Sequence, residues 1–421
     1  MSILKRAKVE GLWDEKKVEI TFDPSVNFLI GANGSGKTTV LNLIASALSS
    51  DFDGLSRNSF SRIECILSSP KNDTESRVSV VRLVDEFARI SYQYTISSMR
   101  KPDIAFTLVN PSPRYLVSPS MHRVRSDASI IFEGEPSPLD EVVRVKWLTV
   151  HRAPSKVRNE ERTASESSVD RRLTHLSNQL VRYFSKLATQ REKETNRFLR
   201  QMLTAIVYSA SEFIPFSNTK ELNLPDVQAS IEALMDTFLS PNSVEKLKGR
   251  LREHFELAAK ANEEKDRYDL NELIALAAVV PMQKITEEWN STQKKQDAIA
   301  NPRKEFIEVI NEMYKNKSLS LNQKNELEVD LPSGKHLSLS DLSSGEKQLL
   351  ILFAEALLQE KSEFIYIADE PELSLHVTWQ EQLTRNLLKI NPKAQVIFAT
   401  HSPDIVSQFG NKTIDMETLF R

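Results

Sequence analysis

The feature that most constrains this chain is a glycine-rich loop, Gly31–Thr38 (GANGSGKT), with an apolar segment before it and an amphipathic segment after it. Residues 26–30 have the pattern of a short buried strand, and residues 39–48 have the apolar spacing of a helix. Glycines allow successive backbone N–H groups to turn toward one anion, and the start of a helix favours negative charge. The order strand, loop and helix therefore predicts an α/β fold with a phosphate-binding loop.

The loop fits the G-x-x-x-x-G-K-[ST] pattern, whose residues have separate roles. We expect the Lys37 ammonium to lie between the β- and γ-phosphates of a nucleoside triphosphate, and the Thr38 hydroxyl to bind magnesium. The predicted nucleotide-binding residues are Gly31, Asn33, Gly34, Ser35, Gly36, Lys37, Thr38 and Thr39.

A second motif lies far along the chain, where the buried-strand pattern of residues 364–368 ends in Asp369-Glu370-Pro371-Glu372. An acidic residue at the carboxyl end of such a strand lies beside the phosphate loop in doubly wound folds. We predict that Asp369 holds magnesium through water and that Glu370 orients or deprotonates the attacking water. Adjacent residues on a strand face opposite ways, so both can act only because the chain turns at Pro371. We expect a structural role for Glu372.

Two further motifs complete the set. His401, in Thr400-His401-Ser402-Pro403, follows the apolar strand pattern of residues 395–399 and is predicted to reach the γ-phosphate. Leu342–Gln348 (LSSGEKQ) precedes a helical pattern over residues 345–359. A serine hydroxyl and the bare backbone N–H of a glycine at a helix start form an anion site.

The order of these motifs resembles the ABC-type ATPase heads, in the branch that contains the RecF, Rad50, SMC and OLD proteins. Leu342–Gln348 looks like the signature of that family, with Ser344 where a glycine is usual. The resemblance implies a two-lobed head that binds ATP and Mg²⁺ and forms homo-oligomers through paired heads. It also implies that the signature faces the γ-phosphate bound by the opposite protomer, through Ser343, Ser344, Gly345 and Glu346. The segment Leu373–His376 matches the one that crosses the dimer interface, with Ser374 and His376 as its candidate residues.

One element departs from the family pattern. A glutamine that senses magnesium normally ends the strand before the helical insertion, whereas residues 149–152 read Thr-Val-His-Arg. The alternatives are that His151 or Arg152 substitutes for it, or that Gln93 serves from another strand.

The pattern of apolar and polar residues along the chain predicts three segments. Residues 1–155 have an α/β pattern with an antiparallel β portion, and residues 317–421 return to alternating strand and helix; together they form the head. Residues 156–316 form a helical insertion, which begins with Leu173, Leu176, Leu180, Phe184 and Leu187 at helical spacing. We expect a compact insertion in preference to a continuous coiled coil, because prolines interrupt the helical pattern near positions 215, 225, 241, 281 and 302.

Within the family, the residues Ile367–His376 (IADEPELSLH) resemble the stand-alone bacterial ATPases of anti-phage systems, of the PARIS and Septu types. In OLD nucleases a Toprim nuclease domain follows the head, whereas this chain ends soon after His401. The resemblance implies an ATP-hydrolysing sensor and scaffold that controls a separately encoded nuclease effector. A transporter motor is disfavoured, because the long insertion leaves no ordinary coupling region.

The alternative function is a RecF-like DNA repair ATPase that binds DNA directly. It is motivated by a local basic segment with Arg114, His122, Arg123 and Arg125, since a net charge of -3 gives no overall attraction to nucleic acid. Cys65 is the only cysteine, which excludes an internal disulfide and favours a cytoplasmic location. No run of about 18 uncharged apolar residues occurs, so we expect no membrane span.

Overall fold

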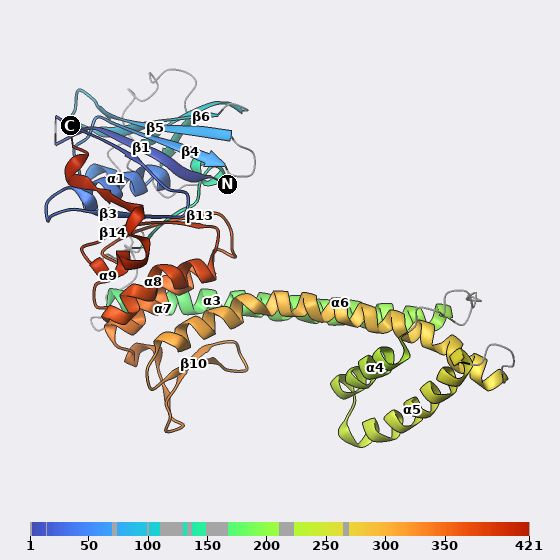
Figure 1. Ribbon diagram of the computed structural model, residues 1–421. Coiled ribbons are helices and arrows are strands. Elements are labelled where there is room, and N and C mark those ends of the chain that lie inside the picture. Colours follow the sequence, from blue (N-terminus) through green and yellow to red (C-terminus); the bar gives the residue numbers. More distant parts are fainter. Residues whose placement is uncertain are drawn as a thin grey trace. The chain divides into compact units, whose positions relative to one another are not determined.

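The computed structural model, shown in Figure 1, describes residues 2–13, 15–69, 74–98, 101–109, 129–132, 137–148, 167–209, 223–263 and 269–420. These residues belong to two compact units. The first joins Met1–Tyr183 to Lys304–Arg421, and the second is Phe184–Arg303. The phosphate loop and the C-terminal motifs therefore belong to one compact unit, although about 300 residues separate them in the sequence.

A five-stranded parallel sheet carries the motifs. Its order is β15 (Thr413–Asp415), β3 (Val26–Ile30), β14 (Ala394–Ala399), β13 (Phe364–Asp369) and β9 (Val145–Leu148). The three central strands are almost wholly buried, which explains their continuous apolar sequences. Because the strands are parallel, their carboxyl ends share one edge, where the loops that carry Lys37, Glu370 and His401 begin.

A seven-stranded sheet forms a second layer of the same unit. Its order is β2 (Lys16–Thr21), β1 (Ile3–Leu12), β4 (Arg62–Ser69), β5 (Thr74–Val84), β6 (Ile90–Ser98), β7 (Lys101–Val109) and β8 (Ser129–Phe132). All neighbours are antiparallel except β7 and β8. Helix α1 (Lys37–Ser49) lies between the two sheets in Figure 1, and its Val40, Leu41 and Ile44 join their common core. The expected α/β fold, with a strand, a glycine-rich loop and a helix in that order, is confirmed.

The remaining elements of this unit are short, apart from two helices. Helices α7 (Ser344–Leu357) and α8 (Val377–Ile390) follow the signature and the turn after β13. The others are α2 (Phe52–Ser56), α9 (Pro403–Val406), β10 (Ser318–Leu321), β11 (Leu327–Asp330), β12 (His336–Leu337), and the 3-10 turns η3 (Pro138–Glu141), η5 (Leu339–Asp341), η6 (Ser407–Lys412) and η7 (Met416–Thr418).

The second unit is helical. Helices α3 (Ser168–Ser209) and α6 (Leu270–Met313) enter it from the first unit, and α4 (Leu224–Phe238) and α5 (Pro241–Glu263) lie between them in the sequence. The Phe198 and Trp289 rings are 5.0 Å apart, and Gln296 Nε2 donates to Thr195 Oγ1 at 2.7 Å. These pairs run in opposite directions along the two sequences, so α3 and α6 are antiparallel. Among the described residues, no helix combines the length with the apolar composition that a membrane span requires.

Some prolines of the insertion lie at the start of a helix, whereas others lie inside one. Helices α4 and α5 begin at or beside Pro225 and Pro241, as breaks at these positions require, whereas Pro215 lies outside the described residues. The breaks predicted at Pro281 and Pro302 are wrong, because α6 continues through both. An interior proline costs about 3 kcal/mol through its missing hydrogen bond and its clash with the preceding turn. Burial of neighbouring apolar side chains offsets that cost, among them Val279, Trp289, Phe306, Val309 and Ile310.

An ion pair stabilises the edge of the parallel sheet, and it makes the free energy of unfolding depend on pH in the acid range. Asp23, just before β3, accepts hydrogen bonds from Lys412 Nζ and from the Ser25 N–H and hydroxyl. Burial raises the pKa of Asp23, but these bonds outweigh it and lower the pKa from 3.8 to about 2. The unfolded chain therefore binds this proton more tightly, so the stabilisation is present above pH ~4 and is lost as the pH falls toward 2.

We expect urea unfolding of the wild type to lose about 2 kcal/mol more between pH 5 and 2 than unfolding of Asp23→Asn. The substitution removes the titrating carboxyl but keeps the size of the side chain. Parallel pH curves for the two proteins would contradict this assignment.

Candidate nucleotide-binding site

The phosphate loop connects β3 to α1. Gly36 is the N-cap residue of α1, with φ of 85°, and no side chain among the described residues caps this helix. The backbone N–H groups of the first helical turn are therefore available to an anion. A Cβ on Gly36 would lie 2.8 Å from Phe420 Cζ and 2.9 Å from the Trp13 ring. Both the left-handed backbone and the close aromatic packing require glycine here.

Lys37 is buried, at 5% exposure, and its ammonium folds over its own loop. Nζ donates to Gly31 O at 2.8 Å and to Ala32 O at 3.0 Å, which are neutral acceptors. Burial lowers the pKa of Lys37, while the charges of Asp369, Glu370 and Glu417 oppose that shift. A buried ammonium beside uncapped helix N–H groups fits the phosphates of a nucleotide.

Thr38 and Asp369 meet across the sheet edge. Thr38 Oγ1 donates to Asp369 Oδ1 at 3.0 Å, although 331 residues separate them in the sequence. Hydroxyl and carboxylate oxygens are ligands that Mg²⁺ prefers, and it commonly takes one or two carboxylates together with substrate phosphates. No group of three or more His, Cys, Asp or Glu side chains that could hold a metal occurs in the described residues. When bound here, Mg²⁺ would neutralise phosphate charge.

Glu370 begins the turn after β13. Its φ is 47°, a left-handed value for a residue other than glycine, and its N–H donates to Ala399 O at 2.8 Å. Such a conformation costs about 1–3 kcal/mol and persists where the surroundings hold it. The turn ends the strand directly after Asp369, as both carboxylates need if they are to serve one site.

His401 lies in the loop after β14, with an exposed side chain. A cavity of about 390 Å³ lies between this loop and the phosphate loop; its lining includes Gly31, Thr400, His401 and Ser402. The structure thus brings the histidine loop to the start of the phosphate loop. Asp369 ends β13, Glu370 follows it, and His401 lies just beyond the neighbouring strand β14, at the edge that carries Lys37.

The signature residues form a capping box at the start of α7. Ser343 N and Oγ each donate to Glu346 Oε2 at 2.8 Å, and Glu346 N donates back to Ser343 Oγ. Burial raises the pKa of the Glu346 carboxyl, but hydrogen bonds from Lys317 and Ser343 outweigh it, so the pKa lies below its ordinary value. Ser343 and Ser344 are exposed. Among the described residues, no hydrogen bond joins residues 343–346 to the phosphate loop of the same chain.

Instead, the signature helix packs on the turn after β13. A Cβ on Gly345 would lie 2.5 Å from Ser374 O, and Gln348 Nε2 donates to Pro371 O at 2.6 Å. Ser374 has φ of 70°, and His376 caps α8 by accepting a bond from Thr378 N. The predicted interface residues Ser374 and His376 are exposed, on a turn that contacts the signature helix.

Gly345→Ala is expected to destabilise the protein by about 1–3 kcal/mol, because the added methyl group must displace the Ser374 carbonyl. In an open helical position the same change would stabilise by up to about 1 kcal/mol. Ser344→Ala, at the exposed neighbouring position, is the matched control and should leave stability within about 0.5 kcal/mol. Chemical denaturation measures both; equal stability of Gly345→Ala and the wild type would contradict the close contact.

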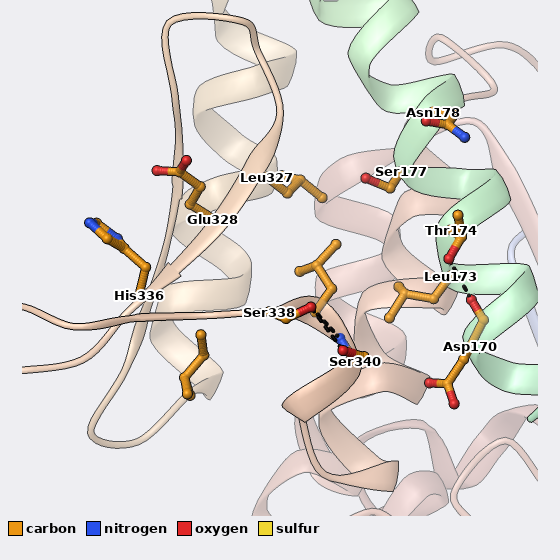
Figure 2. A pocket seen from close by; sticks show the side chains of 12 residues that line it. Asp170, Leu173, Thr174, Ser177, Asn178, Leu327, Glu328, His336, Ser338 and Ser340 are labelled. Carbon is orange, nitrogen blue, oxygen red and sulfur yellow. Dashed lines mark hydrogen bonds between the residues drawn. The ribbon is translucent and has the colours of Figure 1, made fainter. Parts of the chain in front are cut away.

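A second cavity, of about 730 Å³, lies beside the start of α3 (Figure 2). Its lining is mainly polar and comes from α3 and from the segment β11–η5; Figure 2 labels Asp170, Thr174, Glu328, His336 and Ser338 among them. Asp170 also pairs with Lys347 of α7 at 2.7 Å. None of the predicted site residues lines this cavity.

Sequence reasoning missed the contribution of the chain's last residues. Ala32 N donates to Glu417 Oε1 at 2.7 Å, and the Phe420 ring stacks on Trp13 with centroids 5.6 Å apart, against Gly36. Glu417 follows β15 at the same sheet edge as the phosphate loop, and that strand of three residues is too short to have a recognisable pattern in the sequence.

The candidates for the magnesium-sensing position and for the basic segment are not tested by the structure. Residues 149–152, with His151 and Arg152, lie outside the described residues, and so do Arg114, His122, Arg123 and Arg125. Gln93 lies exposed on β6 of the seven-stranded sheet.

The family described as AAA ATPase domain matches residues 4–406. The chain belongs to the AAA ATPase domain family. Two solved structures are similar to this AAA ATPase. The Smc head domain of Pyrococcus furiosus, bound to the C-terminal domain of ScpA, has a TM-score of 0.41 and 14% identity, over 97% of this chain and 92% of that one. The Smc head domain of Pyrococcus yayanosii has a TM-score of 0.39 and 14% identity, over 97% and 93%.

Proposed function

We propose that this AAA ATPase is the sensor and scaffold subunit of a bacterial anti-phage complex. Its heads pair across bound ATP and control a separately encoded toxic nuclease. Within that class, the sequence of Ile367–His376 resembles that of AriA, the ATPase subunit of PARIS systems. PtuA of Septu systems is the near alternative. The observation that best supports nucleotide binding is the hydrogen bond between Thr38 and Asp369. It lies beside the start of α1, which no described side chain caps.

The residues support a direct hydrolysis of ATP. Lys37 and the N–H groups at the start of α1 hold the phosphates, and Thr38 and Asp369 would hold Mg²⁺, which would neutralise phosphate charge. Glu370 accepts a proton as the water oxygen attacks the γ-phosphorus, and the bond to the β-phosphate oxygen breaks. The products are ADP and inorganic phosphate. His401 contacts the γ-phosphate and reports its presence.

The exposed signature, which has no bond to the phosphate loop of its own chain among the described residues, supports the pairing of heads. Ser343 and Ser344 are exposed at the start of α7, and among the described residues no hydrogen bond joins them to the phosphate loop of their own chain. A second copy would provide that loop, so each ATP would lie between Lys37 of one protomer and Ser343 of the other.

Complementation between inactive variants tests the shared site. We expect Lys37→Ala and Ser344→Trp, which places a bulky ring at an exposed signature position, each to hydrolyse ATP about 100-fold more slowly than wild type, and their mixture to recover activity. One site of the mixed pair combines an intact phosphate loop with an intact signature. A mixture as inactive as its components, although the two variants form mixed pairs, would count against a site shared between chains.

The defence role is tested by co-purification of tagged Glu370→Gln protein from its native operon in the presence of ATP. The proposal predicts recovery of a co-encoded nuclease in a fixed ratio, and less of it with Lys37→Ala as the matched control. Recovery of a homo-oligomer that carries DNA would support the RecF-like alternative instead. Recovery of the ATPase alone would remove the scaffold proposal.

A further inference from the structure

One buried carboxyl group outside the predicted catalytic set joins two of the motif loops. Glu372, in the turn after β13, is 7% exposed. Its Oε1 accepts a hydrogen bond from Thr400 Oγ1 and another from His401 N at 3.2 Å. Thr400 is itself 1% exposed. Glu372 Oε1 thus adds a buried side-chain link between the turn that carries Glu370 and the loop that carries His401, beside the backbone bond from Glu370 N to Ala399 O.

Neighbouring contacts hold the same loop in one orientation. Ser402 N donates to Thr400 Oγ1 at 2.9 Å, so the Thr400 hydroxyl both donates to Glu372 and accepts from Ser402. Ser402 Oγ donates to Gln380 Oε1 at 2.6 Å, and Gln380 Nε2 donates to Leu375 O at 2.9 Å. Such a connected network fixes its members more firmly than separate bonds do.

The Glu372 carboxyl is not what stability alone would favour. Its Oε2 is buried and has no hydrogen-bond partner among the described residues. An unsatisfied buried polar atom costs about 1–3 kcal/mol. Burial also raises the pKa of Glu372, although Thr400 and backbone N–H groups act against that shift. The fold therefore keeps the Glu372 carboxyl buried although this lowers stability. The carboxyl lies where it connects the turn after β13 to the His401 loop.

We propose that Glu372 is a positioning residue that holds the His401 loop in register with Glu370, so that both act on one γ-phosphate. This inference rests on the proposed ATP hydrolysis by Glu370. Glu372 itself does not touch the substrate; it acts through Thr400 and the His401 backbone. A displacement of about 1 Å in a positioning element can cost about 100-fold in rate.

Steady-state ATP hydrolysis by four single variants and one double variant tests the proposal. Glu372→Ala and Thr400→Val remove one end of the bond, and each is expected to lower kcat by about 10- to 100-fold. The KM for ATP should change by less than about threefold, because the phosphate loop is intact. Glu372→Gln and Thr400→Ser keep an acceptor or a hydroxyl at the same place and should stay within about threefold of the wild-type kcat. Glu372→Ala combined with Thr400→Val should lose no more than either alone.

Each other outcome has a definite meaning. A lowered melting temperature with unchanged kcat in both Glu372→Ala and Thr400→Val would overturn the proposal and leave a structural role. If Glu372→Ala does not fold, Thr400→Val decides, since it replaces a hydroxyl by a methyl group of similar size. Absence of hydrolysis by the wild type would overturn the proposed function and this inference with it. Hydrolysis by the wild type with full kcat in Thr400→Val would overturn the inference alone.

Discussion

Replacing Glu370 by Gln is expected to lower ATP turnover by about 100-fold or more while ATP binding is kept. The amide preserves the size of the side chain at the left-handed turn after β13, but it cannot accept the proton of the attacking water. Nothing in the phosphate loop changes, so the Kd for ATP should stay close to that of the wild type.

Phosphate release and equilibrium ATP binding measure the two effects separately. Glu381→Gln, an exposed glutamate on α8, is the matched control for loss of one carboxylate and should hydrolyse ATP normally. Unchanged phosphate release by Glu370→Gln would show that another group activates the water.

Lys37→Ala is expected to weaken ATP binding by about 100-fold and to abolish measurable hydrolysis at ordinary ATP concentrations. Charge-assisted bonds to an anion contribute about 1.5–3 kcal/mol each, and the buried Lys37 ammonium lies inside the loop that would hold the phosphates. Loss of this charge leaves the helix N–H groups as the remaining phosphate donors.

Titration calorimetry with ATP measures this loss directly. Lys324→Ala removes a lysine from the exposed turn between β10 and β11 and should bind ATP like the wild type. ATP affinity that is unaffected in Lys37→Ala would exclude Gly31–Thr38 as the phosphate site.

The motif-bearing part of the fold could be predicted because strong local patterns mark it. The apolar runs at residues 26–30, 364–368 and 395–399 all became central strands, and Asp369 and His401 follow the ends that were expected. Glycine spacing and strand hydrophobicity are local properties, so a single sequence contains them.

What could not be predicted depends on contacts between distant residues. Helix α6 continues through Pro281 and Pro302 because packing on either side outweighs a local penalty. The contact of Glu417 with Ala32 depends on β15, a strand too short to show a pattern. The buried link from Glu372 to Thr400 likewise joins residues whose proximity follows only from the parallel pairing of β13 and β14.

The central claim is that ATP brings two heads together and completes each site with the signature of the other chain. The most direct test is the solution mass of Glu370→Gln protein, measured by analytical ultracentrifugation with and without Mg²⁺ and ATP. The account predicts a doubling of the mass upon ATP addition, and no change for Lys37→Ala. Glu370→Gln protein that binds ATP and keeps the same mass would contradict it.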